Sequence, residues 1–180
     1  MRIGLASDTF GNVAVLERAL GLFQRAQADR VFFLGGRAGD VDAALARHAG
    51  APLDVPIVRV ASKACPEYES GKVPRKQMDL VEGRICCLVN DKAELSRDDI
   101  ANASILFHGN SAAAAVVQIG PRCFVTPGHL RAAAPRGHPP SFGIVEVTAR
   151  ELVLTVFSAD CAELRQERAS VVTAGKMSVR

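Results

Sequence analysis

Asp8 stands at the end of a short apolar segment, where a carboxylate could do chemistry. Alternating apolar residues over 3–6 predict a strand, the Gly-Asn pair at 11–12 is typical of a turn, and the spacing over 13–27 predicts a helix. Open α/β sheets bind ligands at the carboxyl ends of their strands, so an acid here suits a metal ion or a phosphate. Phe10, two residues later, can neither coordinate nor donate. The segment has the layout of an active site and lacks part of its chemistry.

Two further groups of residues suit an anion. Gly35, Gly36 and Gly39 lie between a predicted strand and a predicted helix, where backbone N–H groups can cradle a phosphate, although no Gly-Lys-Ser/Thr motif or dinucleotide spacing accompanies them. The segment "GHLRAAAPRGH" brings four cationic or titratable side chains into or near one loop, and a solvated loop is the alternative interpretation. They are His129, Arg131, Arg136 and His138.

The cysteines favour a structural role. Cys65, Cys86, Cys87, Cys123 and Cys161 form an odd set without zinc-site spacing, and the middle pair lies in the apolar run "ICCLV". A thiol–imidazole pair with His108 is an alternative that nothing in the sequence supports. We expect buried, reduced thiols and hence a cytoplasmic protein.

The elements that must position these residues alternate in the first half of the chain. Strands are predicted over 2–7, 30–34 and 57–61, and helices over 13–27 and 40–49, which favours βαβ units and a largely parallel sheet. Residues 62–74 are interpreted as a loop.

The second half is richer in short strands. The segment "KQMDLVEGRICCLVN" predicts two strands joined at Glu82-Gly83, and a short helix near 96–102 precedes strands in "SILFH", "AAVVQIG", "RCFVTPG", "SFGIVEVT" and "ELVLTVFS". We interpret this half as a mixed or antiparallel sheet that packs on the first one, with helices outside. One domain is expected over 1–172, followed by a flexible tail at 173–180.

Composition excludes some partners. The 180 residues carry 22 basic and 19 acidic side chains, a net charge of +3, and the basic residues are scattered, so neither a nucleic-acid footprint nor an anionic-membrane footprint is indicated. No window reaches the roughly 18 apolar residues of a membrane span, and no targeting segment is recognised. Formation of a homo-oligomer stays open.

The order of elements, together with "MRIGLASDTFGN", "VFFLGG", "IVRVASKAC", "SILFHGNS", "CFVTPGHLRAAAPRG" and "PPSFGIVEV", resembles the small calcineurin-like metallophosphoesterases of bacteria and archaea over roughly residues 1–158. The resemblance implies an α/β fold of two β-sheets in a sandwich with flanking helices, a four-layer αββα arrangement. It also implies a pair of metal ions at the strand ends, held by about seven Asp, His and Asn ligands, which activate water for attack on a phosphoester.

Matched to the motifs of that family, the chain lacks most of these ligands. Asp8 keeps a carboxylate of the first motif, while each of the other matched positions holds a residue that coordinates metals weakly or not at all. A lysine in place of a neutral amide would also repel the ions. The substituted positions are Phe10, Gly36 for the bridging aspartate, Lys63, Asn90, Gly109 and Ser111.

Four residues could substitute for the lost ligands, and each has a simpler interpretation. Asp40 and Asp42 could replace the bridging aspartate, but they lie beyond the strand end, where Asp40 would cap a helix. His108 is displaced by one residue and should turn away as a structural histidine. Asp91, beside a lysine, is expected to be an isolated solvated carboxylate.

These losses favour a catalytically inactive protein that acts as a protein-binding scaffold or regulator and has no metal cofactor. The resemblance permits this role, because the retromer subunit of eukaryotes has a similar fold and works as a scaffold. The alternative is a metal-dependent phosphoesterase with an atypical metal site. The emptied cleft could also bind a small phosphorylated ligand, with Arg37, Lys63, Arg131 and Arg136 as anchors.

The retained Asp8 needs compensation if it is buried without metals. We expect a nitrogen of Lys63 or Arg37 within about 4 Å of the Asp8 carboxylate, in place of a metal ion. The alternatives are a cap for the turn at 11–12, or charges that point into water.

Overall fold

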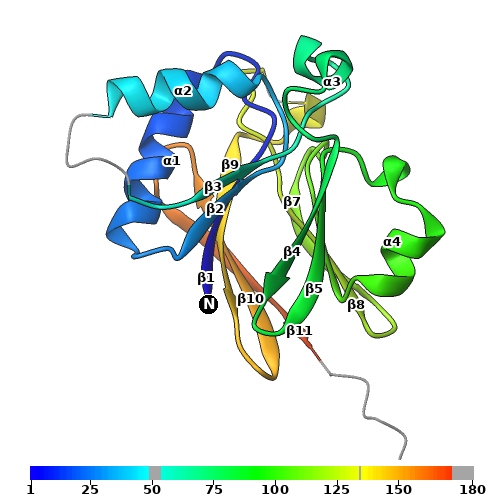
Figure 1. The fold of residues 1–180 in the computed structure, drawn as a ribbon. Helices are drawn as coiled ribbons and strands as arrows, with labels where there is room; N and C mark the ends of the chain where they lie inside the picture. The colour runs from blue at the N-terminus through cyan, green and yellow to red at the C-terminus, as the bar shows by residue number, and fades with distance from the viewer. Residues whose placement is uncertain (49–53, 134, 172–180) are drawn as a thin grey trace, which may run out of the picture.

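The computed structural model describes residues 1–48, 54–133 and 135–171 and contains two β-sheets (Figure 1). The first sheet has the order β11-β10-β9-β1-β2-β3, in which β1, β2 and β3 are parallel and the other neighbours are antiparallel. Its strands are β1 (Arg2–Ala6), β2 (Arg30–Phe33), β3 (Ile57–Arg59), β9 (Ser141–Val147), β10 (Glu151–Ser158) and β11 (Glu163–Ser170).

The second sheet has the order β4-β5-β6-β8-β7, in which β5, β6 and β8 run parallel and the edge strands are antiparallel to their neighbours. Its strands are β4 (Lys76–Val81), β5 (Arg84–Val89), β6 (Ile105–His108), β7 (Ala114–Ile119) and β8 (Arg122–Pro127). Both sheets are therefore mixed.

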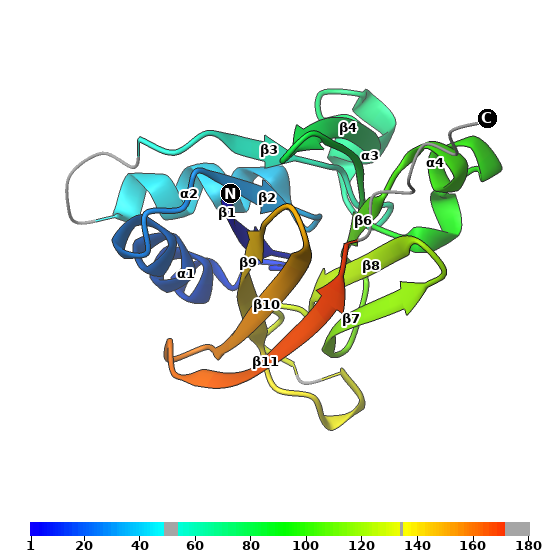
Figure 2. The same ribbon diagram turned by 90° about the horizontal axis from the view of Figure 1, so that it is seen from below.

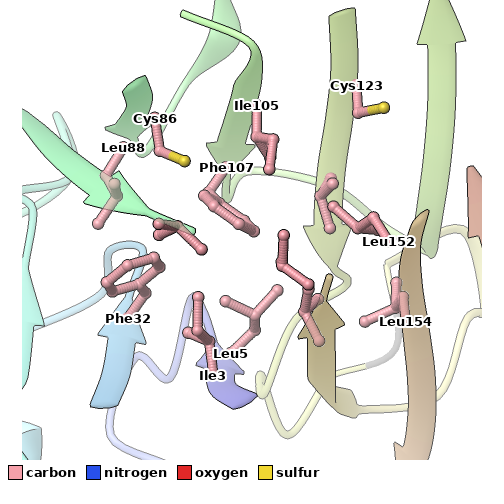
Figure 3. Packing of buried hydrophobic residues seen from close by; sticks show 14 of the residues in the cluster. Ile3, Leu5, Phe32, Cys86, Leu88, Ile105, Phe107, Cys123, Leu152 and Leu154 are labelled. Carbon is pink, nitrogen blue, oxygen red and sulfur yellow. The ribbon is translucent and has the colours of Figure 1, made fainter. Parts of the chain in front are cut away.

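Three apolar layers separate the elements. The largest lies between the sheets, where Ile3, Leu5 and Phe32 face Leu88 and Phe107 (Figure 3). The side chains that alternate with these on the first sheet pack under helices α1 (Val13–Arg25) and α2 (Ala38–Arg47). A smaller cluster on the outside of the second sheet lies under η1 (Lys92–Glu94) and α4 (Arg97–Asn102). The order of layers is helix, sheet, sheet, helix, with a short outer helix on the second sheet (Figure 1).

The predicted two-sheet sandwich with flanking helices is confirmed, and three details differ. The strands β9 and β10, expected in the second sheet, extend the first one. The sequence analysis missed β11 and the helix α3 (Pro66–Ser70), which lies in the predicted loop over 62–74 and has Pro66 at its first turn. A short 3-10 turn, η2 (Pro135–Gly137), lies in the loop between β8 and β9.

β11 also closes one side of the sandwich, because it lies beside β7 of the other sheet (Figure 2). The Val116 backbone N–H donates to Glu167 Oε2 at 2.7 Å, and Arg165 Nη2 donates to the Ala114 carbonyl oxygen at 2.7 Å. Side chains of one edge strand thus satisfy the free backbone groups of another.

None of the helices in the described part of the chain is long and apolar enough to cross a membrane. The end of the helix predicted over 40–49 and the tail predicted at 173–180 lie outside the described residues. The domain boundaries 1–172 stay a prediction.

Candidate functional site

Asp8 follows the carboxyl end of β1 and is 1% exposed, with its backbone in the left-handed region at φ 55°. Three groups donate hydrogen bonds to its carboxylate: Ser7 Oγ at 2.8 Å, Asn90 Nδ2 at 3.1 Å and the Asn110 backbone N–H at 2.7 Å. Its own N–H donates to the Gly35 carbonyl oxygen at 2.7 Å. The protein itself supplies the donors that this buried anion requires.

Asn90, which follows β5, connects three strand ends. Its Nδ2 group donates to the Leu34 carbonyl oxygen at 2.7 Å as well as to Asp8. A Cβ atom on Gly109 would overlap Ser7 Oγ and the Leu34 carbonyl oxygen, and one on Gly35 would overlap the Asn90 amide. We call Ser7, Asp8, Asn90 and the Asn110 N–H the Asp8 cluster. It occupies the space into which side chains at positions 35 and 109 would project.

Gly36, matched to the bridging aspartate, has no room for a side chain. Its φ of +113° disfavours residues other than glycine, and a Cβ atom there would lie 2.7 Å from Thr9 Oγ1 and 2.9 Å from the Thr9 backbone nitrogen. The glycine therefore lets the loop after β1 pack directly against the loop after β2.

Asp40 holds that packing together and is not the predicted helix N-cap. Arg37 occupies the N-cap position of α2, and Asp40 lies buried in the first turn of the helix. Its Oδ2 accepts hydrogen bonds from Thr9 Oγ1 at 2.6 Å and from the Gly11 backbone N–H at 2.8 Å. The carboxylate fixes the loop that carries Asp8, so it is not a free ligand.

The cation that the structure places against Asp8 is Arg131, from the loop after β8. Arg131 Nη2 lies 3.9 Å from Asp8 Oδ1, and the guanidinium stacks over the Phe10 ring, 4.4 Å from its centroid. The expected contact with Lys63 or Arg37 is not found: the Lys63 ammonium lies 3.5 Å from Glu94 Oε1, and among the described residues Arg131 is the cation within 4 Å of Asp8. Phe10 is matched to a metal ligand of the family, and in the structure its ring supports the Arg131 guanidinium. Sequence patterns do not predict this contact.

The remaining candidate ligands are also engaged. His108 is buried and bonded through Nδ1 to the Gly109 carbonyl oxygen at 2.9 Å, in accord with a structural role, and burial lowers its pKa. Asp91 is not an isolated carboxylate, since it accepts from the Ala93 N–H at 2.9 Å and from Asn110 Nδ2 at 3.1 Å. Ser111 Oγ donates to the Ala113 carbonyl oxygen at 2.8 Å.

These residues do not fit the dimetal centre that the resemblance implies. Across residues 1–48, 54–133 and 135–171, no group of three or more His, Cys, Asp and Glu side chains is arranged to hold a metal ion. Asp8 is the matched carboxylate, and its oxygens already accept hydrogen bonds from the cluster. A pair of divalent ions needs several negative or neutral donors around a common point, and this site offers a guanidinium instead.

Two of the four candidate anion-binding residues share a cavity. Arg131 and Arg136 line it with residues of the loop after β6, and its volume is about 280 Å³. Arg37 and Lys63 are not among the residues that line it. The lining consists of Asn110, Ser111, Ala112, Arg131, Pro135 and Arg136.

The cysteines do not form a second site. Four of the five are buried and unpaired, as predicted, and Cys161 is partly exposed. Burial raises the pKa of the Cys86 thiol to about 12 and that of the Cys87 thiol to about 11. Since the thiolate is the reactive form, these two groups are unreactive at neutral pH.

Comparisons with known proteins agree with this architecture. No family model and no curated protein matches the chain. Solved structures do: YfcE, a phosphoesterase from E. coli, is 20% identical, covers 93% of this chain and 98% of its own, and superposes with a TM-score of 0.66. Vps29 from Entamoeba histolytica, complexed with zinc, is 15% identical with a TM-score of 0.70, covering 96% and 100% of the two chains.

A third similar structure is Vps29 from Chaetomium thermophilum complexed with a cyclic peptide. It is 14% identical, covers 95% of this chain and 96% of its own, and has a TM-score of 0.64. Sequence identities of 14–20% support a common fold and do not show a common function. The chain therefore has the metallophosphoesterase-like sandwich fold that the sequence predicted.

Proposed function

We propose that the protein is a catalytically inactive relative of the metallophosphoesterases and acts by binding another protein, as a scaffold or regulator. One observation supports the proposal: Asp8, at a position matched to a metal ligand of the family, accepts hydrogen bonds from Ser7, Asn90 and Asn110 and has the Arg131 guanidinium beside it. In such enzymes the metals supply the nucleophile, the charge clamp and the orientation of the phosphoester. The loss of ligands of every type removes all three.

The exposed apolar side chains of the second sheet support the protein-binding part. Leu80 on β4 and its register partner Ile85 on β5 are 59% and 46% exposed, and the neighbouring Met78 is 41% exposed. Met78 pairs in register with Cys87, which is buried beside α4, so the three side chains lie on the outer face next to that helix. We call Met78, Leu80 and Ile85 the outer-face patch. Contiguous exposed apolar side chains are typical of protein contacts.

The alternative is a metal-dependent phosphoesterase with an atypical site, which the structural similarity to the phosphoesterase YfcE favours. Two measurements distinguish an inactive scaffold from such an enzyme. They are the metal content of the protein and the hydrolysis of generic phosphomonoesters and phosphodiesters with added manganese, nickel or magnesium. We expect well under one metal ion per chain and no activity above that of the buffer. Metal-dependent hydrolysis that disappears in Asp8→Ala, a variant that removes the retained carboxylate, would establish the enzyme instead.

A further inference from the structure

We propose that the cavity between the loop after β6 and the loop after β8 binds the phosphate group of a small phosphomonoester without any metal ion. This inference goes beyond the scaffold role and does not depend on it. The described residues that line the cavity include two arginines and no carboxylate, which makes its wall positive. Guanidinium groups match the geometry of phosphate oxygens through paired hydrogen bonds.

The Arg131 side chain is fixed by a neighbouring ring and is partly exposed. Its guanidinium rests on the Phe10 ring, and its exposed side-chain fraction is 36%. The buried Nε atom has no hydrogen-bond partner among the described residues, which is costly for a charged donor. Because that Nε atom has almost no solvent-accessible surface, a phosphate in the cavity would be bound by the terminal Nη donors of this partly exposed side chain.

Asp8 offsets part of the charge of Arg131 but leaves its hydrogen-bond donors free. The distance of 3.9 Å from Arg131 Nη2 to Asp8 Oδ1 is too long for a hydrogen bond, whereas Ser7, Asn90 and Asn110 already donate to that carboxylate. The guanidinium donors therefore stay available on the side that faces the cavity.

The loop that carries both arginines is fixed at its base by His129. This buried imidazole accepts a hydrogen bond at Nδ1 from the Arg131 N–H and bonds through Nε2 to the His138 carbonyl oxygen, both at 3.1 Å. The Ser141 N–H donates to the His129 carbonyl oxygen at 2.8 Å. A loop tied in this way loses less conformational entropy when an anion binds.

The size of the cavity limits the ligand. A volume of about 280 Å³ lies just below the roughly 300–1,000 Å³ of sites for drug-sized molecules. The cavity accordingly suits a phosphate with a small organic group. The basic residues in the rest of the chain are scattered and do not form a continuous positive surface for a longer polyanion.

The test uses the full chain stripped of metals with EDTA. Inorganic phosphate and O-phosphoserine are titrated and followed by calorimetry and by amide chemical shifts, with serine as the ligand without phosphate. We expect both phosphates to bind, with chemical-shift changes at residues 110–112, 131 and 135–136, an affinity that falls as salt is added, and no binding of serine.

Three variants separate the cavity from general charge. Arg131→Gln and Arg136→Gln should each weaken phosphate binding at least about tenfold, because each removes charged hydrogen-bond donors. Arg97→Gln, which removes the same charge from exposed α4, should leave the affinity unchanged. Arg136 is exposed, so its variant keeps the test decisive even if Arg131→Gln unfolds.

Several outcomes would overturn the inference. Absence of phosphate binding to the folded wild type would do so, as would equal weakening by Arg97→Gln, or a wild-type affinity in Arg136→Gln. Binding that appears only after manganese is added would contradict both this inference and the metal-free scaffold. Metal-free binding that is lost in a folded Arg131→Gln or Arg136→Gln variant would support the cavity whether or not a protein partner exists.

Discussion

Asp8 shows how a buried carboxylate at the end of a strand can be compensated by groups of the protein itself. A buried anion without partners is costly, and metal ions would ordinarily compensate it. Here two side-chain donors and one backbone N–H satisfy its oxygens, and the Arg131 guanidinium adds a positive charge nearby. The carboxylate has a structural role that links the ends of the two sheets.

Removing that carboxylate should therefore destabilise the fold. Asp8→Ala leaves the Ser7 hydroxyl, the Asn90 amide and the Asn110 N–H without their acceptor, so we expect the free energy of unfolding in urea to fall by about 1–3 kcal/mol. Asp160→Ala, at an exposed position, should change it by less than about 0.5 kcal/mol. Equal stability of the two variants would show that the cluster contributes nothing.

An aspartate introduced at position 36, which is matched to the family's bridging ligand, should not create a metal site. In Gly36→Asp the new Cβ atom meets the backbone of Thr9, and φ of +113° is strained for any L side chain, so we expect a loss of about 1–3 kcal/mol in unfolding free energy. Gly39→Ala, in α2 with open space around it, should be neutral or slightly stabilising. A stable Gly36→Asp protein that retains manganese after gel filtration would refute this account.

At the residue scale, the sequence shows which matched positions differ from the family motifs, such as Gly36 and Phe10, but it does not show what surrounds Asp8 in the fold. Arg131 follows Asp8 by more than a hundred residues, and only the return of β9 to the side of β1 brings its loop to that carboxylate. Lys63 also follows a strand next to β1 in the sequence prediction, yet its ammonium pairs with Glu94 at 3.5 Å.

At the scale of elements, β11 is the strand that sequence patterns conceal. Its sequence "ELRQERAS" has Leu164 and Ala169 as its apolar residues, so neither alternation nor an apolar run marks it. Its charged side chains instead bond to the free edge of β7. By contrast, β1, α1 and β2 carry regular apolar periods and were predicted within two residues at their ends.

The contact between β11 and β7 can be tested at a single amide. In Glu167→Ala the Val116 N–H loses its acceptor, and we expect its hydrogen exchange to quicken by about tenfold. Glu163→Ala, on the same strand, should leave the exchange of Val116 unchanged. If Val116 exchanges equally slowly in both variants, the two edges are held together by other contacts.

Two buried histidines should make stability depend on pH. Burial lowers the pKa of His108 and His129 from the ordinary value of 6.5, so the unfolded chain takes up protons first as the pH falls. The contribution of the two neutral histidines to the free energy of unfolding should be fully present above pH 6.5. It should decrease as the pH falls from there towards the folded-state pKa values, and it should level off below them. Protonation of His129 at Nδ1 would also remove the acceptor of the Arg131 N–H, because two N–H groups would then face each other.

This dependence is measured as the difference in unfolding free energy between about pH 7.5 and about pH 5.5. The double variant His108→Gln, His129→Gln should show a smaller difference than the wild type, because its buried amides do not titrate. The same difference in both proteins would assign the pH dependence to other groups.

At the scale of the whole molecule, the two sheets are covered unequally. α1 and α2 cover much of the outer face of the first sheet, whereas the second carries a helix of six residues (Figure 1). Leu80, Ile85, Val117 and Ile119 consequently stay exposed on the second sheet. Such a face can contact another protein whether or not the strand ends bind metal ions.

The outer-face patch should tolerate a charged substitution that the adjacent core position does not tolerate. Leu80 is 59% exposed and Val81 beside it is 0% exposed, since successive residues of β4 point to opposite faces. Leu80→Glu should therefore change the unfolding free energy by less than about 0.5 kcal/mol, whereas Val81→Glu buries a charge in the core and should prevent stable folding.

If the patch binds the partner, a protein that co-purifies specifically with the wild type and binds it directly after purification should bind Leu80→Glu at least about tenfold more weakly. Gln77→Glu adds the same charge to the same strand but on the alternate face, and it should keep the wild-type affinity. Equal affinity of all three proteins would place the binding surface elsewhere. Weakening by Gln77→Glu as much as by Leu80→Glu would mean that added negative charge, and not the loss of apolar contact, reduces the affinity.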